Sequence, residues 1–117
     1  MKNILLIEDN SNKMEMIKLE LRELGYEPVC ARNVEEAFAS FPAKQWDAIA
    51  IDGCLDGHNF NCQPLIKKFV AECKKGCILL AMSSATELSE EMVGLGCTHM
   101  VRKKEHAAGK IHKLLKE

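Results

Sequence analysis

The chain has 117 residues, of which 47% are hydrophobic and 28% charged, and its formal net charge is −1. This length suits one domain with one core, and so small a charge gives no general attraction to nucleic acid or anionic lipid. No apolar segment approaches the ~20 residues that span a bilayer, and no signal-peptide pattern opens the chain. We therefore expect a cytoplasmic protein with one domain, residues 1–117, that binds neither nucleic acid nor membranes.

Five apolar runs alternate with segments in which apolar residues recur every three or four positions. The runs are typical of buried strands, and the other segments are typical of helices with one apolar face. The expected strands are residues 4–7, 28–31, 48–51, 77–82 and 99–101. This alternation predicts an α/β fold in which helices cover both faces of a parallel sheet. The last helix is expected to end near the terminus, which leaves no room for a second domain.

Local signals refine several of these elements. Asn10 or Ser11 can cap the first helix, and Asn33 with Glu36 resembles a capping box for the second. Pro28 has no N–H to donate to a ladder, so the second strand is expected at an edge of the sheet. The apolar face of the third helix is expected to contain Leu65, Ile66, Phe69, Val70 and Cys73.

Six cysteines are present. An even count indicates disulfides mainly in small secreted chains with poor cores, so here we expect free thiols that pack as small apolar side chains. Cys54, His58 and Cys62 recur every four residues, but Gly57 and the asparagines nearby predict a loop. Chance spacing therefore explains these three residues better than a metal site does.

Polar side chains are expected to meet where the strands end. Parallel strands share one carboxyl edge, and ligands of open α/β sheets bind there. The residues at that edge are Glu8 and Asp9, Asp52, Ser83 and Ser84, and Arg102, Lys103 and Lys104. Crowded carboxylates repel one another, and Mg²⁺, which prefers oxygen ligands, relieves that repulsion. A lysine and a serine hydroxyl suit phosphoryl oxygens, so the sequence predicts a site for a phosphoryl group on a metal ion.

Two other phosphate sites are excluded by the segment after the first strand. It contains neither GxGxxG nor GxxxxGK[ST], so a dinucleotide fold and a P-loop both lack their first requirement.

The whole chain resembles the receiver domains of two-component response regulators. The resemblance implies a flavodoxin-like (βα)₅ fold with strand order 2-1-3-4-5, in which the second strand lies at an edge. Its motifs correspond to the acidic pair Glu8 and Asp9, Asp52 in "DAIAIDG", Ser83 in "LLAMSSA" with Ser84 as the fallback, and Lys103, seven residues after Gly96, in "GCTHMVRKK".

The resemblance implies that Asp52 accepts a phosphoryl group from a sensor histidine kinase or a histidine phosphotransfer protein. Lys103 would pair with that group and Ser83 would hydrogen-bond it. The implied ligands of Mg²⁺ are Glu8, Asp9, Asp52 and the backbone carbonyl of Cys54. The domain would then change its binding to a downstream protein partner without being a turnover enzyme, and a homodimer is left open.

Three features, one of them a pair of residues, depart from the family pattern. Lys104 stands where a proline usually follows the lysine, and Met100 stands at the aromatic switch position. Leu55 and Asp56 replace a common methionine–proline pair. Since methionine repacks but cannot reproduce a swinging tyrosine, the output switch is expected to diverge while the chemistry is retained.

Two alternatives remain at this stage. A pseudo-receiver would use the same fold as an unphosphorylated docking module, although the intact acidic residues argue against it. A Mg²⁺-dependent phosphohydrolase ranks last, because phosphatases of the DxD type separate their two acids by one residue and Glu8 and Asp9 are adjacent.

Overall fold

The computed structural model describes residues 1–57 and 59–117. The possible metal site at Cys54, His58 and Cys62 includes His58, which lies outside the described residues. Five parallel strands form one sheet in the order β2-β1-β3-β4-β5. Their bounds are β1 Ile4–Ile7, β2 Val29–Ala31, β3 Ala48–Asp52, β4 Ile78–Met82 and β5 His99–Val101. The predicted order is confirmed, and the strand that follows Pro28 lies at an edge.

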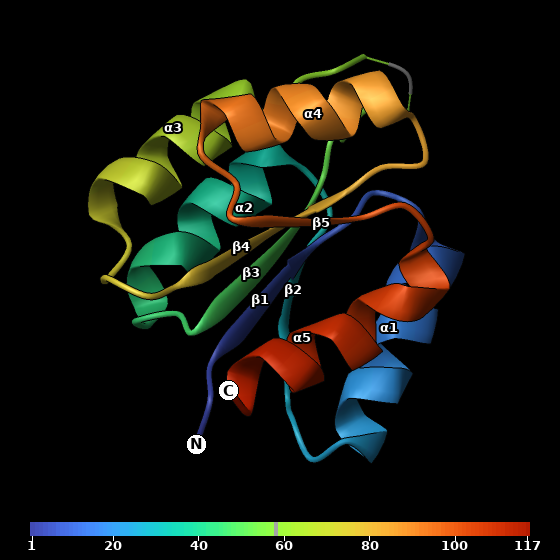
Figure 1. Cartoon of the computed structure of the whole chain (residues 1–117), viewed down its shortest axis with the longest axis vertical. Helices are drawn as coiled ribbons and strands as arrows, with labels where there is room; N and C mark the ends of the chain where they lie inside the picture. The colour runs from blue at the N-terminus through green and yellow to red at the C-terminus, as the bar shows by residue number, and fades with distance from the viewer. Residues whose placement is uncertain (58) are drawn as a thin grey trace.

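Five α-helices connect the strands and cover both faces of the sheet (Figure 1). Helices α1 and α5 lie on one face, while α2, α3 and α4 lie on the other. Their bounds are α1 Ser11–Glu23, α2 Val34–Ser40, α3 Gln63–Glu72, α4 Thr86–Leu95 and α5 Ala107–Leu115, with 3₁₀ turns at Phe41–Ala43 and Lys104–His106. Within the described ranges, none of these helices has the length and apolar character needed to cross a membrane.

The predicted caps fix where the first two helices begin. The Asn10 side chain accepts a hydrogen bond from the backbone N–H of Lys13 at 3.0 Å. The Asn33 side chain accepts one from Glu36 N–H at 2.8 Å, and the Glu36 carboxylate accepts one from the N–H of Arg32 at 2.9 Å. The return bond therefore comes one residue earlier than in a capping box, and it still satisfies a free donor at the helix start.

Strand β1 is buried on both faces, as its unbroken apolar run predicted. Leu5 and Ile7 pack toward α2, α3 and α4, and Ile4 and Leu6 pack toward α1 and α5. Each such burial stabilises the fold by about 1.5–3 kcal/mol. The strand is therefore firmly anchored, and its carboxyl end has a fixed position.

The prediction that Val70 belongs to the buried face of α3 is wrong, because its side chain is 53% exposed. Val70 packs sideways over the end of α4, where Gly96 has a φ of +128°. A Cβ at Gly96 would collide with the Val70 side chain, so both the backbone angle and the close approach require glycine there. The other members of the predicted face, Leu65, Ile66, Phe69 and Cys73, pack in or against the core.

Candidate functional site

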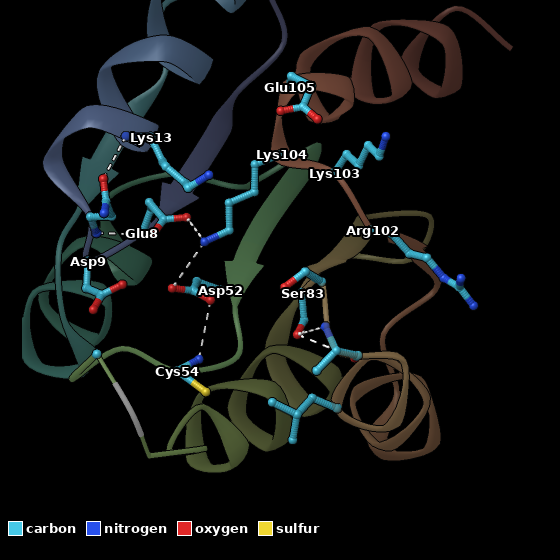
Figure 2. A pocket seen from close by; sticks show the side chains of 15 residues that line it. Glu8, Asp9, Lys13, Asp52, Cys54, Ser83, Arg102, Lys103, Lys104 and Glu105 are labelled. Carbon is cyan, nitrogen blue, oxygen red and sulfur yellow. Dashed lines mark hydrogen bonds and ion pairs between the residues drawn. The ribbon is translucent and has the colours of Figure 1, made fainter.

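A cleft of about 500 Å³ lies at the carboxyl ends of the strands (Figure 2). Its walls come from separate segments: the loop after β1, the end of β3, the loop after β4 and the turn after β5. The predicted site residues that line it include Glu8, Asp9, Asp52, Cys54, Ser83 and Ser84. The sheet topology thus brings together residues that are far apart in the sequence, as the strand-end argument predicted.

Glu8 is a carboxylate with no exposed surface. Its Oε2 accepts a hydrogen bond from the backbone N–H of Asn10 at 3.1 Å, and its Oε1 lies 2.5 Å from the Lys104 ammonium. No hydrogen bond from another described residue reaches Oε1. Because a buried carboxylate without a partner is strongly destabilising, the lysine compensates a charge that the fold has removed from water.

Asp52 ends β3 and is 7% exposed. Its Oδ1 accepts a weak hydrogen bond from Cys54 N–H at 3.3 Å, and its Oδ2 lies 3.5 Å from the Lys104 ammonium. Burial, a hydrogen bond with the Asp9 carboxyl and the charge of Glu8 together raise the pKa of Asp52 to about 8, although Lys104 opposes them. Without a further cation, Asp52 therefore holds a proton over much of the neutral range.

The three acids fit a divalent metal ion. Glu8, Asp9 and Asp52 each offer a carboxylate oxygen, and these oxygens lie within 4.8 Å of one another. Hard oxygen donors at such separations suit Mg²⁺. The pKa of Asp52 is raised first by burial, and the charge of Glu8 adds to that rise. The fourth predicted ligand, the carbonyl of Cys54, belongs to a residue that lines the same cleft.

The lysine that contacts the acids is Lys104, whereas the resemblance implied that Lys103, which lines the same cleft, pairs with the phosphoryl group. The Lys104 side chain is 16% exposed and reaches both Glu8 and Asp52, whereas Lys103 is exposed and points away from the acids, as Arg102 also does (Figure 2). Lys103 has extended backbone angles, φ −112° and ψ 122°, and the chain turns into a 3₁₀ segment at Lys104. That turn directs the Lys104 side chain into the cleft. Counting seven residues from Gly96 could not reveal the turn.

Ser83 and Ser84 differ in environment. Ser83 is 8% exposed, and its hydroxyl accepts a hydrogen bond from Ala85 N–H at 3.2 Å, while Ser84 is exposed. Both line the cleft. The Ser83 hydroxyl also donates weakly to the carbonyl of Ala85 at 3.5 Å, and it would exchange this donated bond to contact a bound group.

Ser89 is a residue that the sequence reasoning missed. It lies in α4 with no exposed surface, and its hydroxyl donates a hydrogen bond to the backbone carbonyl of Ser83 at 3.0 Å. The bond ties the helix to the loop that closes one side of the cleft. A usable signal existed in the sequence, since Ser89 precedes Met92 by three positions and therefore shares its buried helix face.

Helix α4 also contacts the other side of the cleft through Met92. A Cβ placed on Gly53, the residue after Asp52, would lie 3.3 Å from the Met92 sulfur and 3.4 Å from the Phe60 ring. The glycine therefore lets α4 and the loop after β3 approach the backbone beside the Asp52 carboxylate. One helix face thus touches both loops that border Asp52.

The remaining departures from the family pattern lie outside the acidic cluster. Met100 is partly buried and packs against the core on the α2–α4 side of the sheet. Leu55 is 4% exposed, and its N–H donates a hydrogen bond to the Asn61 side chain at 2.8 Å. Asp56 accepts hydrogen bonds from the backbone and the side chain of Asn59, so these residues shape the loop itself.

The sequence matches no protein-family model and no curated protein. Solved structures do match over almost the whole chain. A two-component response regulator from Clostridium difficile is 20% identical with a TM-score of 0.83, and the match covers 100% of this chain and 98% of that one. The chemotaxis response regulator CheY4 of Vibrio cholerae is 21% identical with a TM-score of 0.81, covering 97% and 98% of the two chains.

A third match is the response regulator TrrA from Thermotoga maritima, solved in complex with Mg²⁺ and BeF. It is 25% identical with a TM-score of 0.80, and the match covers 97% of this chain and 99% of that one. All three have the architecture that the resemblance implied, with the same whole-chain extent. The chain has the flavodoxin-like fold of the CheY-like receiver domains of response regulators.

Proposed function

We propose that this protein acts in two-component signalling and accepts a phosphoryl group on Asp52 from a sensor histidine kinase or a histidine phosphotransfer protein. The observation that carries the proposal is the position of Asp52, whose carboxylate lies in an open cleft between two other acids and 3.5 Å from the Lys104 ammonium. The fold likeness to response regulators supports the same assignment.

The acidic cluster would hold Mg²⁺ through Glu8, Asp9, Asp52 and the backbone carbonyl of Cys54. When bound there, the ion would supply positive charge that keeps Asp52 ionised and offsets the charge of phosphoryl oxygens. The complex of the Thermotoga maritima regulator with Mg²⁺ and BeF agrees with this choice of metal.

The remaining chemistry belongs to the side chains around Asp52. An Asp52 carboxylate oxygen attacks the phosphorus, the new O–P bond forms, and the N–P bond of the phosphohistidine breaks and leaves its electron pair on the imidazole. Lys104, already beside Asp52, is the cation placed to receive a phosphoryl oxygen, and the Ser83 hydroxyl can turn toward another. These residues position and neutralise charge, which is the main requirement of phosphoryl transfer.

A second reading, the unphosphorylated docking module, is favoured by one observation. The Lys104 ammonium lies 2.5 Å from Glu8, so the chain already supplies a cation at the acids. If Lys104 takes the place of a metal ion at the acids, the cluster serves only to stabilise the fold and Asp52 gains no phosphoryl group. The two readings therefore differ in a single measurable event.

The test is intact mass spectrometry after incubation with Mg²⁺ and acetyl phosphate. The proposal expects wild type to gain one phosphoryl group, Asp52→Asn to gain none, and the control Glu23→Gln, at an exposed position in the last turn of α1, to behave as wild type. No gain in wild type, beside a known receiver domain that is phosphorylated in the same buffer, would establish the docking module. Continuous release of phosphate over many turnovers would instead indicate a phosphohydrolase.

A further inference from the structure

Two cysteines lie together at the end of the sheet opposite the acidic cleft. Cys73 ends α3, and Cys77 immediately precedes β4. Between them the chain makes a tight turn, in which Cys77 N–H donates to the carbonyl of Lys74 at 3.2 Å and Gly76 has a φ of +88°. The two cysteines therefore lie at the two ends of one tight turn, and the Cys77 sulfur lies 3.8 Å from the carbonyl oxygen of Ile78.

The two sulfurs have different access to solvent. Cys73 is half-buried and lines a second cleft, of about 230 Å³, together with Trp46 and Lys74. Cys77 is only 8% exposed. A small reagent can therefore reach the first thiol, while the second stands behind it as an internal partner.

The pKa values of the two thiols shift in opposite directions. The interaction with the Cys77 thiol holds the pKa of Cys73 below that of an ordinary thiol. That same interaction, with burial, raises the pKa of Cys77. Burial raises the pKa of Cys30 and Cys54, and it raises the pKa values of Cys62 and Cys97 to about 12. Since the thiolate is the reactive form, Cys73 is the cysteine best suited to react.

We propose that Cys73 and Cys77 form an oxidant-sensitive dithiol that closes to a disulfide on exposure to a peroxide. The Cys73 thiol loses its proton, its sulfur attacks one peroxide oxygen, and the O–O bond breaks. The products are a sulfenic acid at Cys73 and, for hydrogen peroxide, a hydroxide that takes up the released proton and becomes water. The Cys77 sulfur then attacks the Cys73 sulfur, the S–S bond forms, and the sulfenic oxygen leaves as a second water with the Cys77 proton.

The surroundings permit this closure. Residues 74–76 between the cysteines are exposed, so the turn can adjust to the geometry that a disulfide needs without disturbing the core. The site is separate from the proposed phosphorylation site, because Cys77 precedes β4 and Ser83 follows it. The proposal therefore stands whether or not Asp52 is phosphorylated.

The test is thiol counting on the full chain. The reduced protein is treated with one equivalent of hydrogen peroxide, unfolded, labelled with N-ethylmaleimide and analysed by intact mass and peptide mapping. Of the six thiols, two are expected to be lost, both in the peptides that carry Cys73 and Cys77. Cys73→Ser, which removes the attacking sulfur, is expected to keep all its remaining thiols. Cys77→Ala is expected to lose only the Cys73 thiol, as a sulfenic acid, and to form no disulfide.

Matched controls are Cys30→Ser and Cys54→Ser, which remove the other two half-buried thiols and are expected to lose the same pair as wild type. Retention of all six thiols under conditions that oxidise a reference dithiol would overturn the proposal. So would a disulfide that involves any other cysteine, or oxidation of Cys73 to its sulfinic or sulfonic acid with Cys77 still labelled.

Discussion

The Lys104 ammonium lies 2.5 Å from the Glu8 carboxylate, which no solvent reaches. A buried charge of this kind persists only when an opposite charge accompanies it. The nearest residue of the same type, Lys103, is exposed and has no such contact to the acids. The pair therefore distinguishes two adjacent lysines that the sequence alone makes look equivalent.

Lys104→Met is expected to destabilise the metal-free protein by about 2–4 kcal/mol, because it leaves Glu8 buried without its counter-charge. Lys103→Met, which removes the same charge from an exposed side chain, is expected to change stability by less than about 0.5 kcal/mol. Urea unfolding of both variants measures the difference, and Lys104→Met combined with Glu8→Gln should recover part of the loss. Equal effects of the two lysine variants would contradict the assignment.

Substitutions of the same two lysines are expected to change the rate of phosphoryl transfer by different amounts. Lys104→Ala should slow the gain of mass from acetyl phosphate by about tenfold or more, since it removes the cation beside the acceptor oxygen. Lys103→Ala should stay within about twofold of wild type, because it changes only an exposed charge. Both rates are measured at a temperature where circular dichroism shows each variant folded. A slow Lys103→Ala beside a normal Lys104→Ala would restore the assignment based on sequence spacing.

Stability of the metal-free protein is expected to fall as the pH rises from about 5 to 8. The pKa of Asp52 is raised in the folded state to about 8 from its ordinary value of 3.8, so the folded state binds more protons than the unfolded state between these values. The stabilisation is complete below the unfolded pKa and is lost as the pH approaches the folded one. Asp52→Asn should flatten this slope and be more stable than wild type at pH 8, by at least about 1 kcal/mol.

Urea unfolding at a series of pH values tests that expectation, with Glu23→Gln, which removes an exposed carboxylate at the far end of α1, as the control variant. A wild-type slope that survives in Asp52→Asn would assign the titration to another group.

The contact between Gly53 and Met92 predicts that α4 responds directly to chemistry at Asp52. The Met92 methyl resonance is expected to shift when the protein is phosphorylated, because its sulfur packs against the backbone next to the acceptor. Met14, buried on the opposite face of the sheet, serves as the control methyl group and should shift much less. Methyl NMR of protein whose phosphorylation is verified by mass makes the test, and an unchanged Met92 signal would contradict it.

A matching variant is Gly53→Ala, whose Cβ would lie 3.3 Å from the Met92 sulfur. A methionine can move by a few tenths of an ångström, so we expect a loss of about 1 kcal/mol and a displaced Met92 resonance before any phosphoryl group is added.

Most of the fold could be predicted from sequence because local and long-range signals agree. The continuous run Ile4–Ile7 indicated a strand buried on two faces, Pro28 indicated an edge, and Asn10 indicated a helix start. Val70 was misassigned because helical periodicity identifies an apolar stripe but does not show how much of the stripe's edge other elements bury. The neighbour that it covers, Gly96, comes from the far end of another helix.

The candidate site was predicted less completely. Glu8, Asp9 and Asp52 followed from the rule that strand ends meet, which depends only on topology. The choice between Lys103 and Lys104 depends instead on backbone angles in a short turn, which spacing cannot supply. Ser89 was missed because its role rests on a hydrogen bond to a carbonyl, and carbonyls carry no sequence signature.

The length of strand β4 sets the distance between the two proposed sites, because its five residues lie between Cys77 and Ser83. At about 3.3 Å per residue the two ends are roughly 20 Å apart. That is beyond the ~8 Å over which charges act through physiological salt. A rigid, doubly buried strand also transmits little local rearrangement. A phosphoryl group at one end and a disulfide at the other would therefore form independently, and a protein carrying both would record two separate inputs in four distinguishable states.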